Sequence, residues 1–467
     1  MRVVPNILLL RVAFIPGIPA ITLLVYDQGF LRIVSAACLC AVFLAVIIDL
    51  VISRSRISQV EVESPGLVRG TKSREMEVLL AFINPGPLLK RLRYGIPVSR
   101  FFRIESEIEG VIENLGSGKK HAVNLRLTPL KRGRYRFDNL HVETDSVIGF
   151  WLVRRRISLK TEMRVYPDLS IERKRLASIF LMRGHEGTHL VRQVGKGRDF
   201  EQLREYQTGD DYVDIDWKAT ARRQMPVTRT YQIEKTQEVY VVVDHSRLSG
   251  REIRVPLDEG LTDEWLYPEA SSGGEEVIST QLEKFLHCAL ILASVAEKQG
   301  DQFGFVSFSD KVDQFIKAKS GKGHYNVIRD ALFTLEPESV APDFEPLMIA
   351  LRQKLNRRSL IIMLIDLSDP FTAEHFFGAL PLINRQHLIL VNMVRPARAR
   401  ELFSRQSAPD SNGEIYEELG GHLQWQELKE IGNQLRHLGV ELGLPDHEEL
   451  CTEAVTQYLN VKNRQLI

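Results

Sequence analysis

Residues 239–244 read VYVVVD, and residues 360–366 read LIIMLID. Each stretch is an apolar run of strand length that ends in an aspartate, and the first is rich in β-branched residues. Residues 303–308 and 387–391 form two more apolar runs, and segments with helical periodicity lie between the four. Buried strands that alternate with helices are typical of a mostly parallel sheet with helices on both faces. The second half of the chain is therefore predicted to be an α/β domain.

Two aspartates at the ends of these strands form the first candidate site. The carboxyl ends of neighbouring parallel strands meet at the edge where such folds bind ligands, and Asp244 and Asp366 both lie there. With the Ser246 hydroxyl they offer the oxygen ligands that Mg²⁺ prefers. In an Asp-x-Ser-x-Ser pattern, Leu248 occupies the place of the second serine, and Ser249 is displaced by one residue. The site is thus degenerate, and the alternative is that Asp244 and Ser246 serve only as strand-end caps.

The N-terminal residues 1–56 are predicted to form a membrane hairpin. Residues 6–25 and 31–53 are apolar over about 20 residues each, which is the length that a bilayer core requires. The link between them is so short that both ends of the hairpin lie on one side. Because Arg54 and Arg56 follow the hairpin, the positive-inside rule places its ends and the rest of the chain in the cytoplasm, at the inner (plasma) membrane. A cleaved signal peptide followed by a single anchor is the alternative.

Two charged residues lie inside these apolar runs. Arg11 is near the start of the first run, and Asp49 is near the end of the second. In an antiparallel hairpin the two residues fall at a similar depth. We therefore expect them either to pair with each other or to extend separately to the lipid headgroups.

Three segments follow the hairpin. Residues 57–168 alternate polar and apolar residues between frequent turns, which predicts an all-β, sandwich-like domain. Residues 169–236 form a connector, and residues 237–467 form the α/β domain with its C-terminal helices. Within that domain, residues 251–276 are rich in Asp and Glu at the predicted ligand edge of the sheet. This acidic insertion is either a lid or docking segment or a mobile solvated loop.

The composition of the whole chain excludes some classes of function. The 467 residues include 61 Lys and Arg against 60 Asp and Glu, which leaves a net charge of +1. Without a basic excess, binding to nucleic acid has no electrostatic support. Four cysteines in a chain of this length do not form a disulfide scaffold.

A second metal-binding pattern occurs in the connector. Residues 185–189 read HEGTH, which matches HExxH, a motif in which a helix directs both histidines at one zinc ion. A glycine inside the motif disfavours that helix by about 1 kcal/mol, and no third ligand follows at a zincin spacing. We therefore expect no enzyme. The alternative is a metal-dependent hydrolase that uses His185 and His189 or the strand-end carboxylates Asp244 and Asp366.

The densest mixture of acids, bases and aromatic residues lies at residues 197–233. Asp216 is placed to cap a short helix over residues 217–223. Trp217, at the start of that helix, is predicted to be a core anchor between the two domains. The charged residues of this stretch are predicted to brace the domain interface or to dock a partner. The predicted interface residues are Arg204, Asp210, Asp211, Asp216, Trp217, Lys218 and Arg222.

The same stretch resembles the signature of the domain-of-unknown-function 58 (DUF58) family. The likeness rests on GRDF at residues 197–200, LREY at 203–206, GDD at 209–211, IDWKA at 215–219 and AR at 221–222. The N-terminal hairpin also fits the family, as do RGRY at residues 132–135 and IGF at residues 148–150. The resemblance thus extends over nearly the whole chain.

The resemblance implies a membrane-anchored cytoplasmic protein in which a β domain precedes a von Willebrand factor A-like (Rossmann-type) domain. The metal ligands of such a domain correspond here to Asp244, Ser246 and Asp366, with Mg²⁺ as the ion, although Leu248 departs from the pattern. The resemblance also implies a MoxR-type AAA+ ATPase as partner and a chaperone-like role in the assembly or maturation of client proteins. The prediction is therefore a non-enzymatic adaptor at the membrane bilayer.

Overall fold

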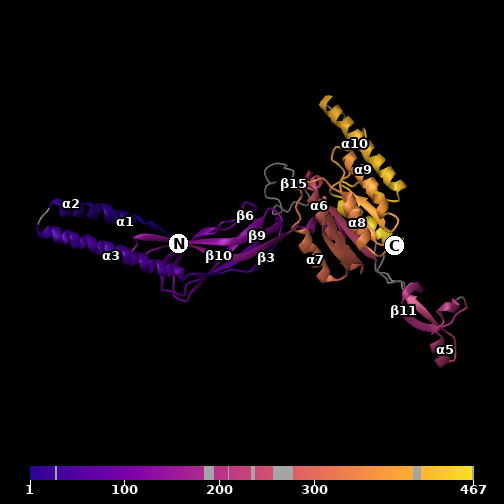
Figure 1. Ribbon diagram of the computed structural model, residues 1–467, viewed down its shortest axis with the longest axis horizontal. Coiled ribbons are helices and arrows are strands. Elements are labelled where there is room, and N and C mark those ends of the chain that lie inside the picture. Colours follow the sequence, from indigo (N-terminus) through magenta and orange to yellow (C-terminus); the bar gives the residue numbers. More distant parts are fainter. Residues whose placement is uncertain are drawn as a thin grey trace. The chain divides into compact units, whose positions relative to one another are not determined.

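The computed structural model describes residues 1–26, 29–182, 194–208, 210–232, 237–255, 277–402 and 412–464 (Figure 1). The chain divides into two compact units, Met1–Asp168 and Leu169–Ile467. The first unit holds the predicted hairpin together with the predicted β domain. The second unit holds the predicted connector together with the predicted α/β domain.

Two apolar helical segments open the first unit. One runs from α1 (Ile7–Val12) through a π-helical turn (Ala13–Gly17) into α2 (Ile18–Tyr26), and the other is α3 (Phe30–Ser58). The π-helical turn contains Pro16, which lacks an N–H group and cannot continue a regular α-helix without distortion. Residues Ile7–Val25 and Phe30–Ser58 are long and apolar enough to cross a bilayer. The chain therefore has the two N-terminal candidate membrane helices that the sequence predicts.

The β-rich body of this unit consists of two sheets that share one core. The larger sheet has the order β1-β10-β9-β5-β7, with β3 paired to β10, and comprises β1 (Arg2–Pro5), β3 (Leu67–Thr71), β5 (Leu89–Gly95), β7 (Glu109–Leu115), β9 (Gly133–Asp145) and β10 (Trp151–Tyr166). The smaller sheet has the order β2-β4-β8-β6 and comprises β2 (Glu61–Glu63), β4 (Met76–Ile83), β6 (Phe102–Ile104) and β8 (Lys120–Pro129). Leu80 of β4 and Leu140 of β9 are fully buried in the shared core. The pairs are antiparallel except for β3 with β10, so the unit has the expected sandwich-like arrangement.

Both ends of the helical hairpin are tied to this β body. Before the hairpin, β1 pairs with β10. After it, the buried Asp49 of α3 accepts hydrogen bonds from the Ser146 hydroxyl and from the backbone N–H groups of Ile148 and Phe150. Gly149 lies between these donors with a φ of 101°. That left-handed conformation favours glycine and lets the loop close around the carboxylate.

The structure corrects the expectation for the charge in the second apolar run. Asp49 is buried against the loop before β10 and is not paired with Arg11, which is exposed. Near Asp49, the indole N–H of Trp151 donates to the Val46 carbonyl at 3.0 Å. Arg155 Nη1 donates to three carbonyls at and just after the end of α3, at 2.7 to 2.9 Å. The C-terminal part of α3 is therefore part of the β body, and neither pairing with Arg11 nor extension to the headgroups applies to Asp49.

A six-stranded, mostly parallel sheet forms the centre of the second unit. Its order is β17-β16-β13-β18-β19-β20, and it comprises β13 (Glu238–Asp244), β16 (Gln302–Phe308), β17 (Val312–Lys319), β18 (Leu360–Leu364), β19 (Leu388–Asn392) and β20 (Glu441–Gly443). Only the edge strand β17 pairs in antiparallel fashion within this sheet. The four strands predicted from the apolar runs are β13, β16, β18 and β19. Numbered along the chain, the strands follow the doubly wound order 3-2-1-4-5-6.

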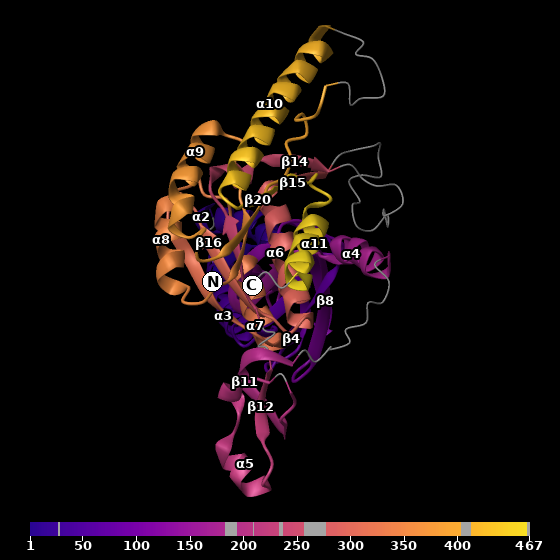
Figure 2. The same cartoon turned by 90° about the vertical axis from the view of Figure 1, so that its right-hand side faces the viewer.

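Helices cover both faces of this sheet, with α8 and α9 on the opposite side from α6 and α11 (Figure 2). Alternate residues of β13 enter two separate cores. Val241 faces a core completed by α4 (Ser170–Met182), α6 (Gln281–Lys298), α7 (Lys322–Leu332) and α11 (Leu450–Asn463). Val242 faces a core completed by α8 (Phe344–Lys354), α9 (Pro370–Ala379) and α10 (Asn412–His437). The C-terminal helices predicted for this domain are α10 and α11.

Two antiparallel hairpins complete the described part of the second unit. β11 (Val194–Glu205) pairs with β12 (Val227–Gln232), and a 3-10 turn (Tyr212–Asp214) and α5 (Trp217–Arg223) lie between them in the chain. We call these elements together the signature block. β14 (Glu252–Val255) pairs with β15 (Val277–Thr280), and the two strands flank most of the acidic insertion in the sequence.

Candidate functional site: the carboxyl edge of the sheet and the signature block

The predicted strand-end carboxylates lie at one edge of the central sheet. Asp244 is the last residue of β13, and Asp366 follows β18, which is a parallel neighbour of β13. In each loop the aspartate accepts a hydrogen bond at 2.8 Å from the backbone N–H two residues later, that of Ser246 or Ser368. Both carboxylates are buried. The fold thus brings Asp244, Ser246 and Asp366 to the same edge, as the sequence predicts.

The environment of Asp244 is unfavourable for its charge. Its pKa is raised to about 6, chiefly by burial and in addition by the charge of Asp366, while the Ser246 backbone N–H acts in the opposite direction. Within the described part of the chain, Asp244 Oδ2 and Ser246 Oγ are buried without a hydrogen-bond partner. Two such oxygens fit part of the ligand set of a divalent cation.

The third predicted ligand already has a positively charged partner. Arg251 Nη1 donates to Asp366 Oδ2 at 3.1 Å and to the Ser368 hydroxyl at 2.6 Å. The hydroxyl of Ser249, displaced by one residue from the Asp-x-Ser-x-Ser pattern, donates instead to the Ser246 carbonyl at 2.8 Å. Asp244 and Ser246 therefore fit a cation. Asp366 could bind the same cation only if its ion pair with Arg251 were broken.

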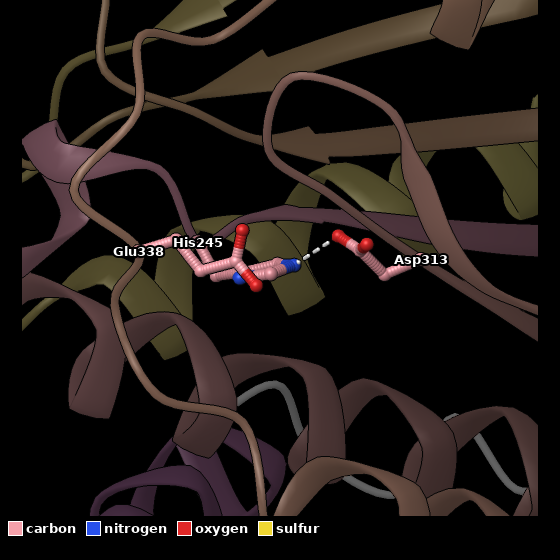
Figure 3. Close-up of side chains that lie close together, drawn as sticks. All are labelled: His245, Asp313 and Glu338. Atoms are coloured by element: carbon pink, nitrogen blue, oxygen red, sulfur yellow. Dashed lines mark hydrogen bonds and ion pairs between the residues drawn. The ribbon is translucent and has the colours of Figure 1, made fainter.

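A second group of side chains lies at the same edge, and sequence reasoning missed it (Figure 3). His245, Asp313 and Glu338 each place a potential ligand atom within 4.8 Å of the others. The ring of His245 is only 3% exposed, and its Nε2 lies 2.6 Å from Asp313 Oδ2. The three residues come from the loop after β13, from β17 and from the loop before α8. No local spacing connects them, and only the antiparallel return of β17 beside β16 could have indicated that Asp313 approaches the end of β13.

The signature block is built around two arginine–carboxylate pairs. Asp216 caps α5, as predicted, by accepting from the Lys218 and Ala219 backbone N–H groups at 3.0 Å, and it also pairs with Arg229 at 2.9 Å. These contacts, the backbone hydrogen bond from Ala219 first, lower the pKa of Asp216. In a second pair, Arg204 Nη2 lies 2.5 Å from Asp210 Oδ1.

The position of Asp210 is fixed in the same way. The Gln207 backbone N–H donates to its carboxylate at 2.9 Å, and this bond, followed by the contact with Arg204, lowers the pKa of Asp210. Burial acts in the opposite direction and is outweighed. Both ion pairs join residues within the block. Asp211, Lys218 and Arg222, the other charged residues predicted here, are exposed.

The prediction that Trp217 is a buried core anchor is wrong. Its side chain is 68% exposed at the start of α5, so the tryptophan contributes surface and not core. Three other large apolar residues of the same block are also exposed, namely Tyr212 at 73%, Val213 at 89% and Met225 at 44%. The charged residues nearby hold the backbone in place, and the apolar residues are left on its surface. We call these four residues the apolar surface of the signature block.

Two stretches considered in the sequence analysis lie outside the described residues. The HExxH match, with His185 and His189, falls within residues 183–193. Of the acidic insertion, only Arg251 and β14 are described, and residues 256–276 are not. The alternative hydrolase based on His185 and His189 therefore stays a prediction.

Comparison with protein families finds a match over the signature block and most of the central sheet. Residues 202–251 and 262–404 match the family described as "Protein of unknown function DUF58". The chain carries a DUF58 domain. This domain includes the apolar surface of the signature block and the predicted ligands Asp244, Ser246 and Asp366. It also includes the group formed by His245, Asp313 and Glu338.

The chain is also similar to curated bacterial proteins. An uncharacterized protein of Mycobacterium tuberculosis is 23% identical over 218 residues, which is 46% of this chain and 61% of the relative. The uncharacterized protein YeaD of Bacillus subtilis is 23% identical over 122 residues, which is 26% of this chain and 30% of YeaD. The chain thus spans less than two thirds of the length of these relatives.

Solved structures show only distant likeness. The conserved hypothetical protein BatB from Bacteroides thetaiotaomicron is 12% identical and covers 49% of this chain and 99% of its own, with a TM-score of 0.28. An aerotolerance-related membrane protein from Bacteroides fragilis is 13% identical and covers 48% and 98%, with a TM-score of 0.26. Likeness at this level assigns neither a fold nor a function.

Proposed function

We propose that this protein is a non-enzymatic adaptor that the N-terminal hairpin anchors in the inner (plasma) membrane, with its other parts in the cytoplasm. In this proposal the DUF58 domain binds a protein partner through the signature block. The observation that carries the proposal is the apolar surface of Tyr212, Val213, Trp217 and Met225. These four exposed side chains lie within residues 212–225, among charged residues, and exposed apolar surface with a polar surround is typical of a protein interaction site.

The construction of the block suits it to binding. Tryptophan, tyrosine and arginine are enriched among the residues that dominate the binding energy of protein interfaces. Tryptophan and tyrosine bury much surface with only two side-chain torsions each. The capping contacts of Asp216 hold the start of α5, which carries Trp217, and the Arg204–Asp210 pair holds the loop before it. A surface that is ordered before binding loses less conformational entropy when the partner docks.

The charges around the apolar surface favour an acidic partner. Lys218 and Arg222 are exposed on α5 beside Trp217. Charges at the rim of an interface act mainly on orientation and association rate. We therefore expect association to slow as ionic strength rises.

The partner we propose is a MoxR-type AAA+ ATPase, acting with this protein in the chaperone-like assembly or maturation of client proteins. The family resemblance supports this partner. The doubly wound strand order, with acidic residues at the carboxyl edge of the sheet, supports a von Willebrand factor A-like domain. Such an edge would serve as a second contact surface, for a client or for the ATPase.

The proposed orientation follows from the hairpin. Since β1 lies before α1 and β2 follows α3, and both strands belong to the β body, both ends of the hairpin lie on one side of the bilayer. Arg2, Arg54 and Arg56 at those ends favour the cytoplasmic side. A cysteine introduced at the exposed Ser117 should react with a membrane-impermeant maleimide only after the cells are opened. Labelling of intact cells would place the β body outside and contradict the proposal.

The docking proposal is tested by affinity purification from native membranes after crosslinking. We expect an ATPase to co-purify with the parent protein and to be reduced at least tenfold with the double variant Tyr212→Ala, Trp217→Ala. Tyr416→Ala is the matched control, because Tyr416 is an exposed aromatic residue of α10, at 76% exposure, outside the signature block. Equal recovery with the double variant and with the control would contradict docking through this surface.

A further inference from the structure

The carboxyl edge of the sheet carries a second set of potential metal ligands, separate from Asp244, Ser246 and Asp366. We propose that His245, Asp313 and Glu338 bind one first-row divalent transition-metal ion, for which Zn²⁺ is the best match. One imidazole and two carboxylates form a mixed nitrogen and oxygen donor set, which suits Zn²⁺ better than Mg²⁺. The ligand atoms lie within 4.8 Å of one another, so small side-chain adjustments bring all three to one ion (Figure 3).

Backbone contacts hold the three ligands in place. The His245 N–H donates to the Phe308 carbonyl at 3.0 Å, which fixes the loop after β13 to the end of β16. The Glu338 N–H donates to the His245 carbonyl at 2.7 Å, which fixes the loop before α8 to the same residue. Asp313 lies in β17, which pairs with β16. Ligands on elements that are already joined need little reorganisation to bind an ion.

Three carboxylates of exposed residues converge on one buried hydroxyl in this region. Carboxylate oxygens of Asp310, Asp313 and Glu338 all lie 3.0 to 3.2 Å from the buried Ser309 hydroxyl. A hydroxyl has one proton and can donate to only one of the three. No lysine or arginine of the described residues forms an ion pair with any of these carboxylates. A divalent cation would relieve the repulsion among these neighbouring carboxylates.

The imidazole of His245 is also incompletely bonded. Its ring is 97% buried, and Nδ1 has no hydrogen-bond partner among the residues described. A buried histidine normally uses both ring nitrogens, one as donor and one as acceptor or metal ligand. Nε2, which faces Asp313 at 2.6 Å, is the nitrogen that can share one ion with the two carboxylates. The neutral imidazole then carries its proton on Nδ1.

This site differs from the predicted magnesium site in its donors and in its neighbours. His245 lies between Asp244 and Ser246 in the sequence, but its Nε2 contacts Asp313 and not Asp366. Asp366 forms an ion pair with Arg251, whereas among the described residues neither Asp313 nor Glu338 forms an ion pair with a lysine or an arginine. An ion here would join the ends of β13, β16 and β17 to the loop before α8. It would thereby order the edge of the DUF58 domain without any role in chemistry.

The test is direct zinc binding to the full-length protein in detergent after treatment with a chelator. Equilibrium dialysis against ZnCl₂ followed by elemental analysis should give one zinc per chain. Asp313→Asn and Glu338→Gln, which change one atom each at accessible positions, should each weaken zinc affinity at least tenfold. Co²⁺ in place of Zn²⁺ should give absorption bands that change in His245→Gln. Thermal unfolding without metal shows whether each variant is folded.

The control variants are Asp244→Asn and Asp366→Asn, which remove the neighbouring carboxylates and should leave zinc affinity within about twofold of the parent. Sub-stoichiometric zinc in the parent protein would overturn the proposal. Parental affinity in both Asp313→Asn and Glu338→Gln would do the same. Loss of zinc only in Asp244→Asn or Asp366→Asn would assign the ion to the other site and would also refute the inference.

Discussion

Trp151 and Trp217 show how differently two regions of this molecule use the same side chain. Trp151 begins β10 in the first unit, and its indole N–H is bonded to the Val46 carbonyl of α3. Trp217 begins α5 in the second unit and is 68% exposed. The first tryptophan joins a candidate membrane helix, α3, to a β sheet of the same unit. The second lies on a helix that Asp216 caps, and its side chain is exposed, so a partner could bind it.

The charged residues around the two tryptophans differ in the same sense. Asp49, near Trp151, is buried and accepts hydrogen bonds from a loop of another element. Asp216, next to Trp217, bonds only within the signature block. The contacts of Asp49 and Trp151 therefore join α3 to the β body, and each of them adds to stability; we call them the internal joint. In the signature block, the contacts shape a surface whose side chains can be changed with little effect on folding.

The largest expected effect on stability comes from breaking the internal joint. Asp49→Ala removes the acceptor of the Ser146 hydroxyl and of two backbone N–H groups; the bonds from Ser146 and Phe150 are buried, and the bond from Ile148 is partly buried. Leaving buried donors without an acceptor costs about 1–3 kcal/mol each, so we expect the first unit to lose about 3 kcal/mol or more. Denaturant unfolding in detergent, followed by Trp151 fluorescence, measures this loss.

Asp49→Asn serves as the control for that experiment. It keeps one acceptor oxygen near the loop and should therefore cost less than the alanine variant. If the two variants unfold like the parent protein, the joint does not exist as described.

The second prediction concerns the buried carboxylate at the sheet edge. The pKa of Asp244 is raised to about 6 from an ordinary value of 3.8, so the folded state holds its proton more tightly than the unfolded state. At about pH 8 the buried charge costs up to roughly 3 kcal/mol, and this cost disappears as pH falls through 6 towards 4. Asp244→Asn should therefore stabilise the metal-free protein at about pH 8 and have little effect below about pH 4. Urea unfolding at both pH values tests the sign, and destabilisation at the higher pH would contradict it.

The third prediction compares the two tryptophans directly. Trp151→Phe removes one hydrogen bond, that to the Val46 carbonyl, and should cost about 1 kcal/mol. Trp217→Phe changes an exposed side chain and should shift stability by less than about 0.5 kcal/mol. Thermal unfolding of both variants under the same conditions measures the difference. Equal losses would mean that Trp217 is packed after all.

Local patterns were the part of this structure that the sequence could predict. The helix that begins at Trp217 and its Asp216 cap depend on residues within one turn of each other. The strands β13, β16, β18 and β19 are apolar because both of their faces are buried, and that property is visible along each strand. The two candidate membrane helices are likewise visible as long apolar runs.

The contacts that the sequence did not predict join residues that are distant in the chain. Asp49 meets a loop 97 to 101 residues further on, and His245 meets Asp313 after 68 residues. The pairing of β1 with β10, across the whole hairpin and most of the β body, is of the same kind. The exposure of Trp217 could not be predicted for another reason. In the sequence, a tryptophan among charged residues looks the same whether its side chain is buried in a core or exposed for binding.

The central claim is that the exposed face around Trp217 binds a protein. Its most direct test replaces Trp217, in separate proteins expressed in living cells, with a photo-crosslinking amino acid, and does the same at Tyr416 as a control. We predict a discrete crosslinked species at position 217 that contains an AAA+ ATPase and is absent at position 416. An absence of adducts at position 217, or the same adducts at both positions, would contradict the account.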